Sequence, residues 1–397
     1  MKTPANQPKA RKVVLRRTRF VLISDTHNCT PHLPRGDVLI HAGDITNRGT
    51  HLELSRAIQW LEKADFEAKI IIAGNHDVTL DADFYSRIGH VLHAAKPQNP
   101  QACLDLLTSS PSLTYLNHTS KQIALTSPSG PRTTFKLFGS PFSPQLPSRD
   151  TPFAAFTYPS QPLSGDVSSP TTQSPAELPT LWDAIPLDTD VVVTHTPART
   201  HVDGVAECYP YGCEALRRTL WRVRPRLAVC GHVHQARGVE RVTWDLRCGD
   251  IAFKEAGVVG WDDPGQKGNK MSIVNLGAKG GRPLRNDGSS GTGSSLRETA
   301  PDSTGHSRAS DLDARLAIGA LGHGGPDPSS VSCDTAALRG RMKREETCFI
   351  NCSIMTKSHF EVGTKGMNKP IVVDLDLPAW GEEEDDSAIL LGVPGDS

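Results

Sequence analysis

The chain has 397 residues, enough for two or three domains, with 37% hydrophobic and 6% aromatic residues and a formal net charge of −1. The near-zero charge argues against nucleic-acid or membrane partners recognised by bulk charge. The sequence has no run long enough to span a bilayer and no signal-peptide core, so we expect a cytoplasmic protein, with the nucleus as the alternative. The nine cysteines lack zinc-ribbon spacing, which favours reduced, buried thiols.

Composition divides the chain into one folded domain with three polar segments. Residues 1–18 are basic and contain no acid, which predicts a disordered arm, with a transit peptide as the alternative. Residues 282–344 are dominated by Gly, Ser, Asp and Arg and predict a disordered insertion, because strand-like sequence returns after them. Residues 19–281 and 345–380 are therefore assigned to one domain, and residues 381–397 to an acidic tail.

Five short apolar runs are each followed by polar side chains that can bind metals. The runs are residues 20–24, 38–42, 69–73, 191–194 and 227–230. Their length and continuous apolar character predict strands buried on both faces. The residues that follow them include Asp25, His27, Asp44, Asn75, His76, His195, His232 and His234. Because ligands bind at the carboxyl edge of open α/β sheets, we expect these side chains to meet there.

The remaining elements follow from periodicity and capping signals. Helices are predicted at residues 52–66, at 81–88 with Asp81 as N-cap, and at 214–221. Further strands are predicted at residues 113–116, 122–125, 135–138, 239–244, 272–276, 347–354 and 370–375. Residues 143–179 are rich in Pro, Ser and Thr and predict a long loop that overhangs the site.

Seven of the polar residues form a candidate ligand set of carboxylates, one carboxamide and imidazoles, without a thiolate. They are Asp25, His27, Asp44, Asn75, His195, His232 and His234. This mixture suits Mn, Fe or Zn, with Mg as an alternative. Seven ligands exceed what one ion with an open position needs, but they suffice for two ions that share a bridging carboxylate.

The ordered set of sequences resembles the calcineurin-like metallophosphoesterase superfamily. The matching stretches are Leu-Ile-Ser-Asp-Thr-His, Asp-Val-Leu-Ile-His-Ala-Gly-Asp-Ile-Thr, Ala-Gly-Asn-His-Asp, Leu-Phe-Gly-Ser-Pro and Arg-Val-Arg-Pro-Arg-Leu. Within the superfamily, these stretches are most similar to the metallophosphoesterase-domain-containing subfamily known from animal brain and fungi. The resemblance covers most of residues 20–250 and the strands at 347–375. It implies an α/β fold of two packed mixed β-sheets flanked by helices.

The resemblance also implies roles for individual residues. One metal would be held by Asp25, His27, Asp44 and His234, and the other by Asp44, Asn75, His195 and His232. The two ions would bridge a hydroxide that attacks phosphorus, and His76 would face the leaving oxygen. Asn75 and Arg48 would contact the substrate, although Arg48 is equally well explained as a solvated loop residue. Asn47 stands where protein phosphatases of the superfamily carry an aspartate that orients the histidine.

These implications favour dimetal-dependent hydrolysis of phosphodiesters, with cyclic nucleotides among the candidate substrates. The alternatives are a phosphomonoesterase, including a phosphoprotein phosphatase, and a weakly catalytic nucleotide-binding scaffold. Some animal members of the subfamily carry glycine where His232 stands, so the complete ligand set here favours catalysis. We expect a small phosphodiester or nucleotide substrate and neither a nucleic-acid nor a membrane partner, and the oligomeric state is left open. His41 is expected to pack in the sheet, and His201 either to pack or to reach the substrate.

Overall fold

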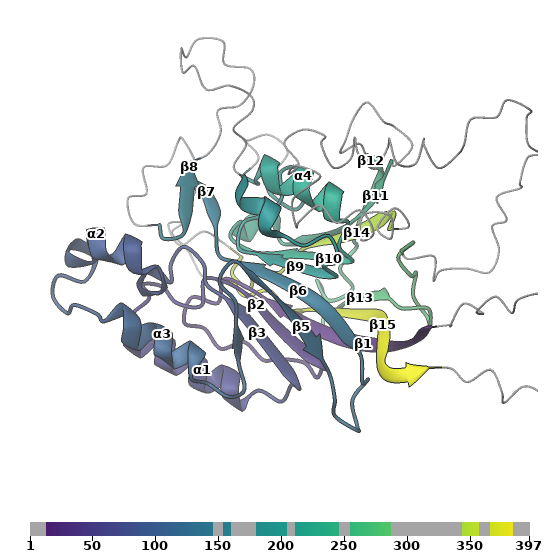
Figure 1. The fold of residues 1–397 in the computed structure, drawn as a ribbon, viewed down its shortest axis with the longest axis horizontal. Coiled ribbons are helices and arrows are strands. Elements are labelled where there is room, and N and C mark those ends of the chain that lie inside the picture. Colours follow the sequence, from purple (N-terminus) through teal and green to yellow (C-terminus); the bar gives the residue numbers. More distant parts are fainter. Residues whose placement is uncertain are drawn as a thin grey trace, which may run out of the picture.

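Two mixed β-sheets packed face to face form the centre of the fold, and helices cover their outer faces (Figure 1). The computed structural model describes residues 13–145, 154–159, 180–204, 211–245, 255–286, 344–356 and 366–383. This architecture confirms the predicted α/β fold of two packed mixed sheets. Within these ranges, no helix combines the length and the apolar composition needed to cross a membrane.

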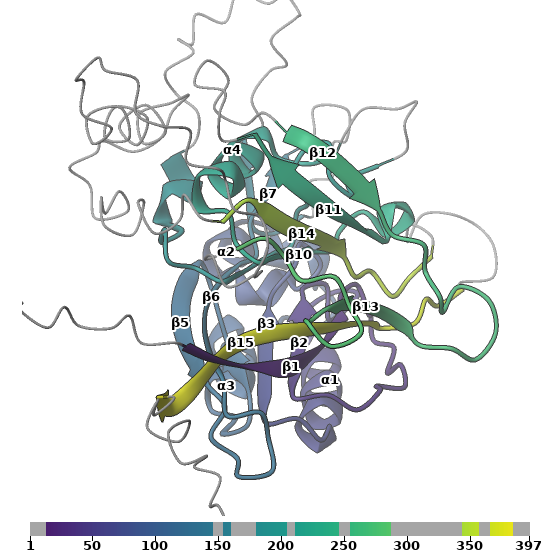
Figure 2. The same ribbon diagram turned by 90° about the vertical axis from the view of Figure 1, so that its right-hand side faces the viewer.

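The first sheet contains six strands and begins with the first strand of the chain. In spatial order they are β13 (Ser272–Leu276), β15 (Ile371–Glu383), β1 (Val13–Ile23), β2 (Val38–Ala42), β3 (Ala68–Ile72) and β4 (Thr114–Tyr115). Strands β1 to β4 run parallel, whereas β15 pairs with β1 in the antiparallel direction. Figure 2 shows β15 lying along β1, although the two strands come from opposite ends of the chain.

The second sheet contains seven strands. In spatial order they are β12 (Glu255–Gly260), β11 (Gly238–Trp244), β14 (Glu346–Asn351), β10 (Leu227–Cys230), β9 (Val191–Thr194), β6 (Thr134–Ser140) and β5 (Thr119–Ala124). The four strands from β14 to β6 run parallel, so their carboxyl ends meet at one edge. A separate pair consists of β7 (Ser143–Gln145) and β8 (Thr157–Pro159).

The helices begin at side-chain caps and pack an apolar face on the sheets. They are α1 (His51–Lys63), α2 (Ala82–Leu92), α3 (Pro100–Thr108) and α4 (Glu214–Val223). Thr50 and Glu53 form a capping box at the start of α1, and Asp81 accepts a hydrogen bond from the Phe84 N–H, as predicted for α2. Short 3₁₀ turns are η1 (Val78–Leu80), η2 (Thr180–Ala184) and η3 (His234–Ala236).

The central strands are buried on both faces, which explains their continuous apolar sequence. In β1, Phe20 and Leu22 enter the core between the two sheets, whereas Val21 and Ile23 face the helices on the outer side. Each fully buried side chain of this kind contributes about 1.5–3 kcal/mol. A third cluster, which includes Trp182 and Leu216, lies between α4 and the second sheet. The two sheets therefore hold their carboxyl edges in fixed positions.

Two predicted boundaries are wrong, because strand pairing extends into polar sequence. The predicted arm at residues 1–18 overlaps β1, which begins at Val13, and residues 1–12 lie outside the described part of the chain. Arg19 donates to both oxygens of Asp374 at 2.7 and 2.8 Å, so basic residues of β1 meet acids of β15. Likewise, β15 continues to Glu383, into the predicted tail, and residues 384–397 lie outside the description.

Other elements were not predicted. Helix α3 and strand β12 lie in stretches that had no assignment, and β7 and β8 lie within the predicted loop at residues 143–179. The other residues of that loop up to 179, and residues 287–343 of the predicted insertion, lie outside the described ranges.

The ends of the predicted insertion meet at β14. The Glu345 N–H donates to the Arg285 carbonyl at 2.9 Å, and the Glu346 N–H donates to Asn286 Oδ1 at 3.2 Å. The Arg285 N–H in turn donates to the Glu346 carboxylate at 2.7 Å. The chain on the two sides of residues 287–343 is therefore already held together.

We expect that replacement of residues 288–342 by a short Gly-Ser linker leaves folding and chemistry intact. The segment is poor in large apolar residues, and closing a loop twice as long costs only about 0.6 kcal/mol more. Thermal melting should stay cooperative, with Tm within a few degrees of the full chain, and metal-dependent activity should be retained. An Asn286→Ala variant of the full chain removes the acceptor of the Glu346 N–H and so measures how much this contact contributes to stability. Loss of the cooperative transition in the shortened protein would contradict the prediction.

Candidate metal centre

The candidate ligands lie in tight turns that follow the strands. Four of them adopt left-handed backbone conformations: φ is 53° at Asp25, 45° at His27, 52° at Asp44 and 68° at His232. Such φ values are unfavourable for residues with a side chain and persist where surrounding structure enforces them, as at functional sites. The turns therefore give the ligands fixed directions at the edge where the two sheets meet.

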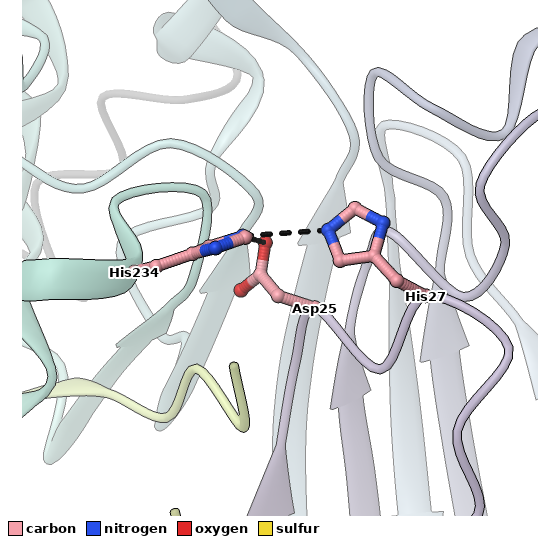
Figure 3. A group of neighbouring side chains, drawn as sticks. All are labelled: Asp25, His27 and His234. Atoms are coloured by element: carbon pink, nitrogen blue, oxygen red, sulfur yellow. Dashed lines mark hydrogen bonds and ion pairs between the residues drawn. The ribbon is translucent and has the colours of Figure 1, made fainter. Parts of the chain in front are cut away.

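A first cluster combines Asp25, His27 and His234, and all three side chains are buried (Figure 3). His234 Nε2 lies 3.3 Å from Asp25 Oδ1 and 3.3 Å from His27 Nε2. Figure 3 shows the two imidazoles directed toward each other beside the carboxylate. Asp25 and His27 follow β1, whereas His234 opens η3 after β10, so the cluster joins the two sheets.

A second cluster combines Asp44, His195 and His232 with the Asn75 amide. His195 Nε2 lies 3.0 Å from Asn75 Oδ1, and His232 Nδ1 lies 2.9 Å from the same oxygen. The two histidine nitrogens are 3.2 Å apart. Four potential ligand atoms from loops after β2, β3, β9 and β10 therefore converge on one point.

Asp44 lies between the two clusters. Its Oδ2 atom is 3.7 Å from His27 Nε2 in the first cluster and 3.4 Å from His195 Nε2 in the second. Its Oδ1 atom accepts the His76 backbone N–H at 2.8 Å. The structure thus brings all seven predicted ligands into one site, with Asp44 between the two clusters.

Backbone carbonyls orient two of the imidazoles. His27 Nδ1 donates to the Thr46 carbonyl at 3.2 Å, and His195 Nδ1 donates to the Ala42 carbonyl at 2.9 Å. A proton held on Nδ1 leaves the Nε2 lone pair for a metal, which is the usual arrangement of metal-binding histidines. Asp25 is held in a similar way, because its Oδ2 atom accepts the Ser353 hydroxyl at 2.8 Å.

The electrostatics of the site suit divalent cations. Burial opposes charge on Asp25 and Asp44, but hydrogen bonds and charge from His234 and His195 keep the pKa of each carboxyl below its usual range. Burial lowers the pKa of His27 to about 4 and of His232 to about 3, so both imidazoles are neutral at pH 7, the form that binds metal.

His195 differs from the other imidazoles of the site. Burial opposes its charge as well, but Asp44 outweighs that effect and raises the pKa of His195 to about 9. A metal at the second cluster would therefore displace a proton from His195. Taken together, anionic carboxylates and imidazoles without a thiolate suit divalent cations at both clusters.

Comparison with known proteins agrees with a metal centre at these residues. A family model described as calcineurin-like phosphoesterase matches residues 18–236, which include all seven ligands. This chain belongs to the calcineurin-like phosphoesterase family. The match confirms the resemblance seen in the sequence, and members of the family typically bind two divalent metals.

Relatives of this family member come from animals and fungi. The human metallophosphoesterase domain-containing protein 1 is 33% identical over 56% of this chain and 62% of its own length. A UPF0046 protein of Caenorhabditis elegans is 30% identical over 56% of this chain and 71% of its own length. A protein of Emericella nidulans named probable rhamnogalacturonate lyase C is 39% identical over 57% of this chain but only 18% of its own length. The chain spans less than two-thirds of the fungal and human relatives.

The predicted catalytic histidine lies beside the first cluster. The rings of His76 and His27 meet edge to face, with centroids 4.9 Å apart. His76 Nδ1 donates to the backbone carbonyl of Asn47 at 3.0 Å. We expected the Asn47 side chain to take this role, but its amide instead donates to the His27 carbonyl at 3.3 Å. A peptide carbonyl therefore orients His76 where phosphatases of this family are expected to use a carboxylate.

Three other residues were weighed from the sequence. Arg48 is exposed on the loop before α1, and its contact with the substrate stays a prediction. His201 is held between Glu240 at 3.1 Å and Glu255 at 3.0 Å and stacks on Phe349, so both of its ring nitrogens are engaged away from the ligands. His41 is buried in the sheet and bonded to the Thr26 hydroxyl at 2.9 Å.

Sequence reasoning missed a carboxylate that joins two ligand loops. Asp77 accepts the Thr46 N–H at 2.9 Å and its hydroxyl at 2.7 Å, the Ile45 N–H at 3.1 Å and the Gly74 N–H at 2.9 Å. These bonds fix the turn that carries Asp44 against the turn that carries Asn75. The signal in the sequence is the carboxylate that ends the Gly-Asn-His-Asp stretch.

Proposed function

We propose that this protein is a metal-dependent phosphodiesterase. The observation that carries the proposal is the position of Asp44 Oδ2 between two imidazole clusters, 3.7 Å from His27 Nε2 and 3.4 Å from His195 Nε2. The family implies metal-dependent hydrolysis of phosphoesters. When bound, two divalent ions neutralise phosphate charge and supply an activated water. The names of the relatives leave the substrate open, so the proposal for its identity rests on the geometry of this chain.

The protein's own residues prepare the site for an in-line displacement. Asp25 and Asp44 supply negative charge. The Thr46 and Ala42 carbonyls fix the ring orientations of His27 and His195. His76 is placed to stabilise or protonate the leaving oxygen, and to donate from Nε2 it must carry a second proton while Nδ1 stays bonded to Asn47. The Asn47 carbonyl fixes the ring but adds no charge beside it, so the site favours esters with good leaving groups.

The charge balance favours diesters over monoesters. A phosphomonoester carries two negative charges at pH 7 and needs additional cations, but Arg48, the arginine assigned to substrate, is exposed. A diester carries one charge, which two metal sites can neutralise. Small phosphodiesters and nucleotides are therefore the proposed substrates, with cyclic nucleotides among them, and the cytoplasm is the proposed compartment.

With Mn²⁺, we expect bis(4-nitrophenyl) phosphate to be hydrolysed with a kcat/KM at least about tenfold above that of 4-nitrophenyl phosphate. That ratio corresponds to about 1.4 kcal/mol of transition-state stabilisation. The measurement is initial rate against concentration for both esters, with metal-free protein as the control. A preference for the monoester would instead support a phosphatase, and Arg48→Ala should then reduce monoester turnover most. No turnover of either ester, with metal bound, would support the scaffold alternative.

A further inference from the structure

A polar pocket of about 280 Å³ lies beside the metal centre and shares His234 with it. The same chain segments build both. Thr356 lines the pocket three residues after Ser353, which holds Asp25. Asn368 also lines the pocket and donates its amide to the Ser353 carbonyl at 3.2 Å. A phosphate bound at the first cluster would therefore have one ester group within reach of this pocket.

The residues that line the pocket carry a net positive charge, and one of them, Arg237, holds a buried donor. Arg237 bonds to Asp263 at 2.9 Å, and the Lys369 ammonium donates to three backbone carbonyls at 2.6–3.0 Å. Two cations and one carboxylate leave a formal charge of +1 on these three residues. Arg237 Nε is buried, and the described residues supply no hydrogen-bond acceptor for it. The wall thus favours an electron-rich, hydrogen-bonding group.

The lining offers hydrogen bonds rather than a stacking surface. Among the described residues that form it, there is no Phe, Tyr or Trp. Stacking of a base on an aromatic ring is worth about 1–3 kcal/mol, and a nucleoside would not gain it here. Gln266 instead provides an amide that can donate and accept, and the oxygens of Asn368 and Thr356 can accept while their protons are donated to the Ser353 and Gly366 carbonyls. This chemistry matches an alcohol with several hydroxyl groups.

We propose that this pocket binds the retained alcohol of the substrate, and that this alcohol is a polyol or sugar. The inference rests on the proposed phosphodiesterase function. The leaving group is assigned to His76, which is not part of the pocket lining, so the pocket takes the group that stays on phosphorus. The substrate class is then a polyol or sugar phosphodiester, and the pocket selects it through hydrogen bonds.

Three diesters with the same nitrophenol leaving group test this directly. Their retained alcohols are methanol, glycerol and thymidine. We expect a KM about tenfold lower for the glyceryl ester than for the methyl ester, with similar kcat. A difference of this size corresponds to one or two additional hydrogen bonds. The thymidine ester should show no such gain. Gln266→Ala should remove most of the glyceryl advantage, whereas Gln59→Ala, at an exposed glutamine of α1, should keep it.

Binding without turnover separates this inference from the proposed function. Calorimetry with glycerol 3-phosphate and methyl phosphate should show tighter binding of the glyceryl compound, again lost in Gln266→Ala. If the esters are not hydrolysed, the proposed function fails. The calorimetric comparison alone then shows whether the pocket binds the glyceryl group. Equal KM and equal affinity for glyceryl and methyl compounds, a preference for thymidine, or a glyceryl preference that survives Gln266→Ala would overturn the inference.

Discussion

Asp44→Asn should cause the largest loss of activity of any single substitution in this protein. Its Oδ2 atom faces both clusters, so one change removes negative charge from two metal sites. Loss of a single preorganised electrostatic group costs about 10²–10³-fold in kcat, so we expect more than ~10³-fold here. Metal content per chain should fall at both sites, and both quantities are measured on the same preparations.

Folding should survive this change. Asparagine keeps an oxygen to accept the His76 N–H, but it removes the charge that is paired with His195, so the metal-free protein should melt at a lower temperature and still in one cooperative transition. Asp105→Asn, at an exposed carboxylate of α3, is the matched control and should leave activity and metal content unchanged. Full metal content with activity within tenfold of the parent would show that Asp44 does not bridge.

His76→Ala should lower kcat by about 10²–10⁴-fold while metal content stays at the parent value. His76 meets the first cluster through the edge of His27, and its assigned role concerns the leaving oxygen. The defect should shrink for diesters whose leaving group has a low pKa, because such groups need little protonation. Rates on a series of graded leaving groups measure this dependence, and added metal should not restore the loss.

His232→Ala provides the contrast within the same site. His232 Nδ1 converges with Asn75 and His195, so its removal should weaken one metal, and high metal concentration should partly restore activity. His90→Ala, at an exposed position of α2, controls for loss of a histidine elsewhere. The role assigned to His76 is wrong if His76→Ala strips metal or if its defect is equal for every leaving group.

The predictions that succeeded depended on strong local signals. Continuous apolar runs such as residues 70–73 correspond to strands that are buried on both faces, and the polar residues after them converge because parallel strands share an edge. The signal that predicted the N-cap of α2 was also local, since Asp81 and its hydrogen-bond partner Phe84 are three residues apart. Ligand types and strand ends could therefore be read from short stretches.

The features that were missed depend on distant or backbone partners. The basic residues at the start of β1 resemble a solvated arm until Asp374, 355 residues away, is known to accept Arg19. Ser353 supports Asp25 across 328 residues. The backbone carbonyl of Asn47 orients His76, and because every residue has such a carbonyl, the sequence does not indicate which one is used. Such contacts arise only when the fold brings their partners together.

The pairing of β1 with β15 also has a consequence for the order of events during protein synthesis. Ribosomes add about 5–20 residues per second, so the 355 residues that separate Arg19 from Asp374 take roughly 20–70 s to make. Throughout that interval β1 can pair with β2 but leaves its other edge exposed. An exposed strand edge attracts other chains, and the basic residues along β1 oppose such association. The same arginines that later bind Asp374 would thus keep the nascent chain soluble.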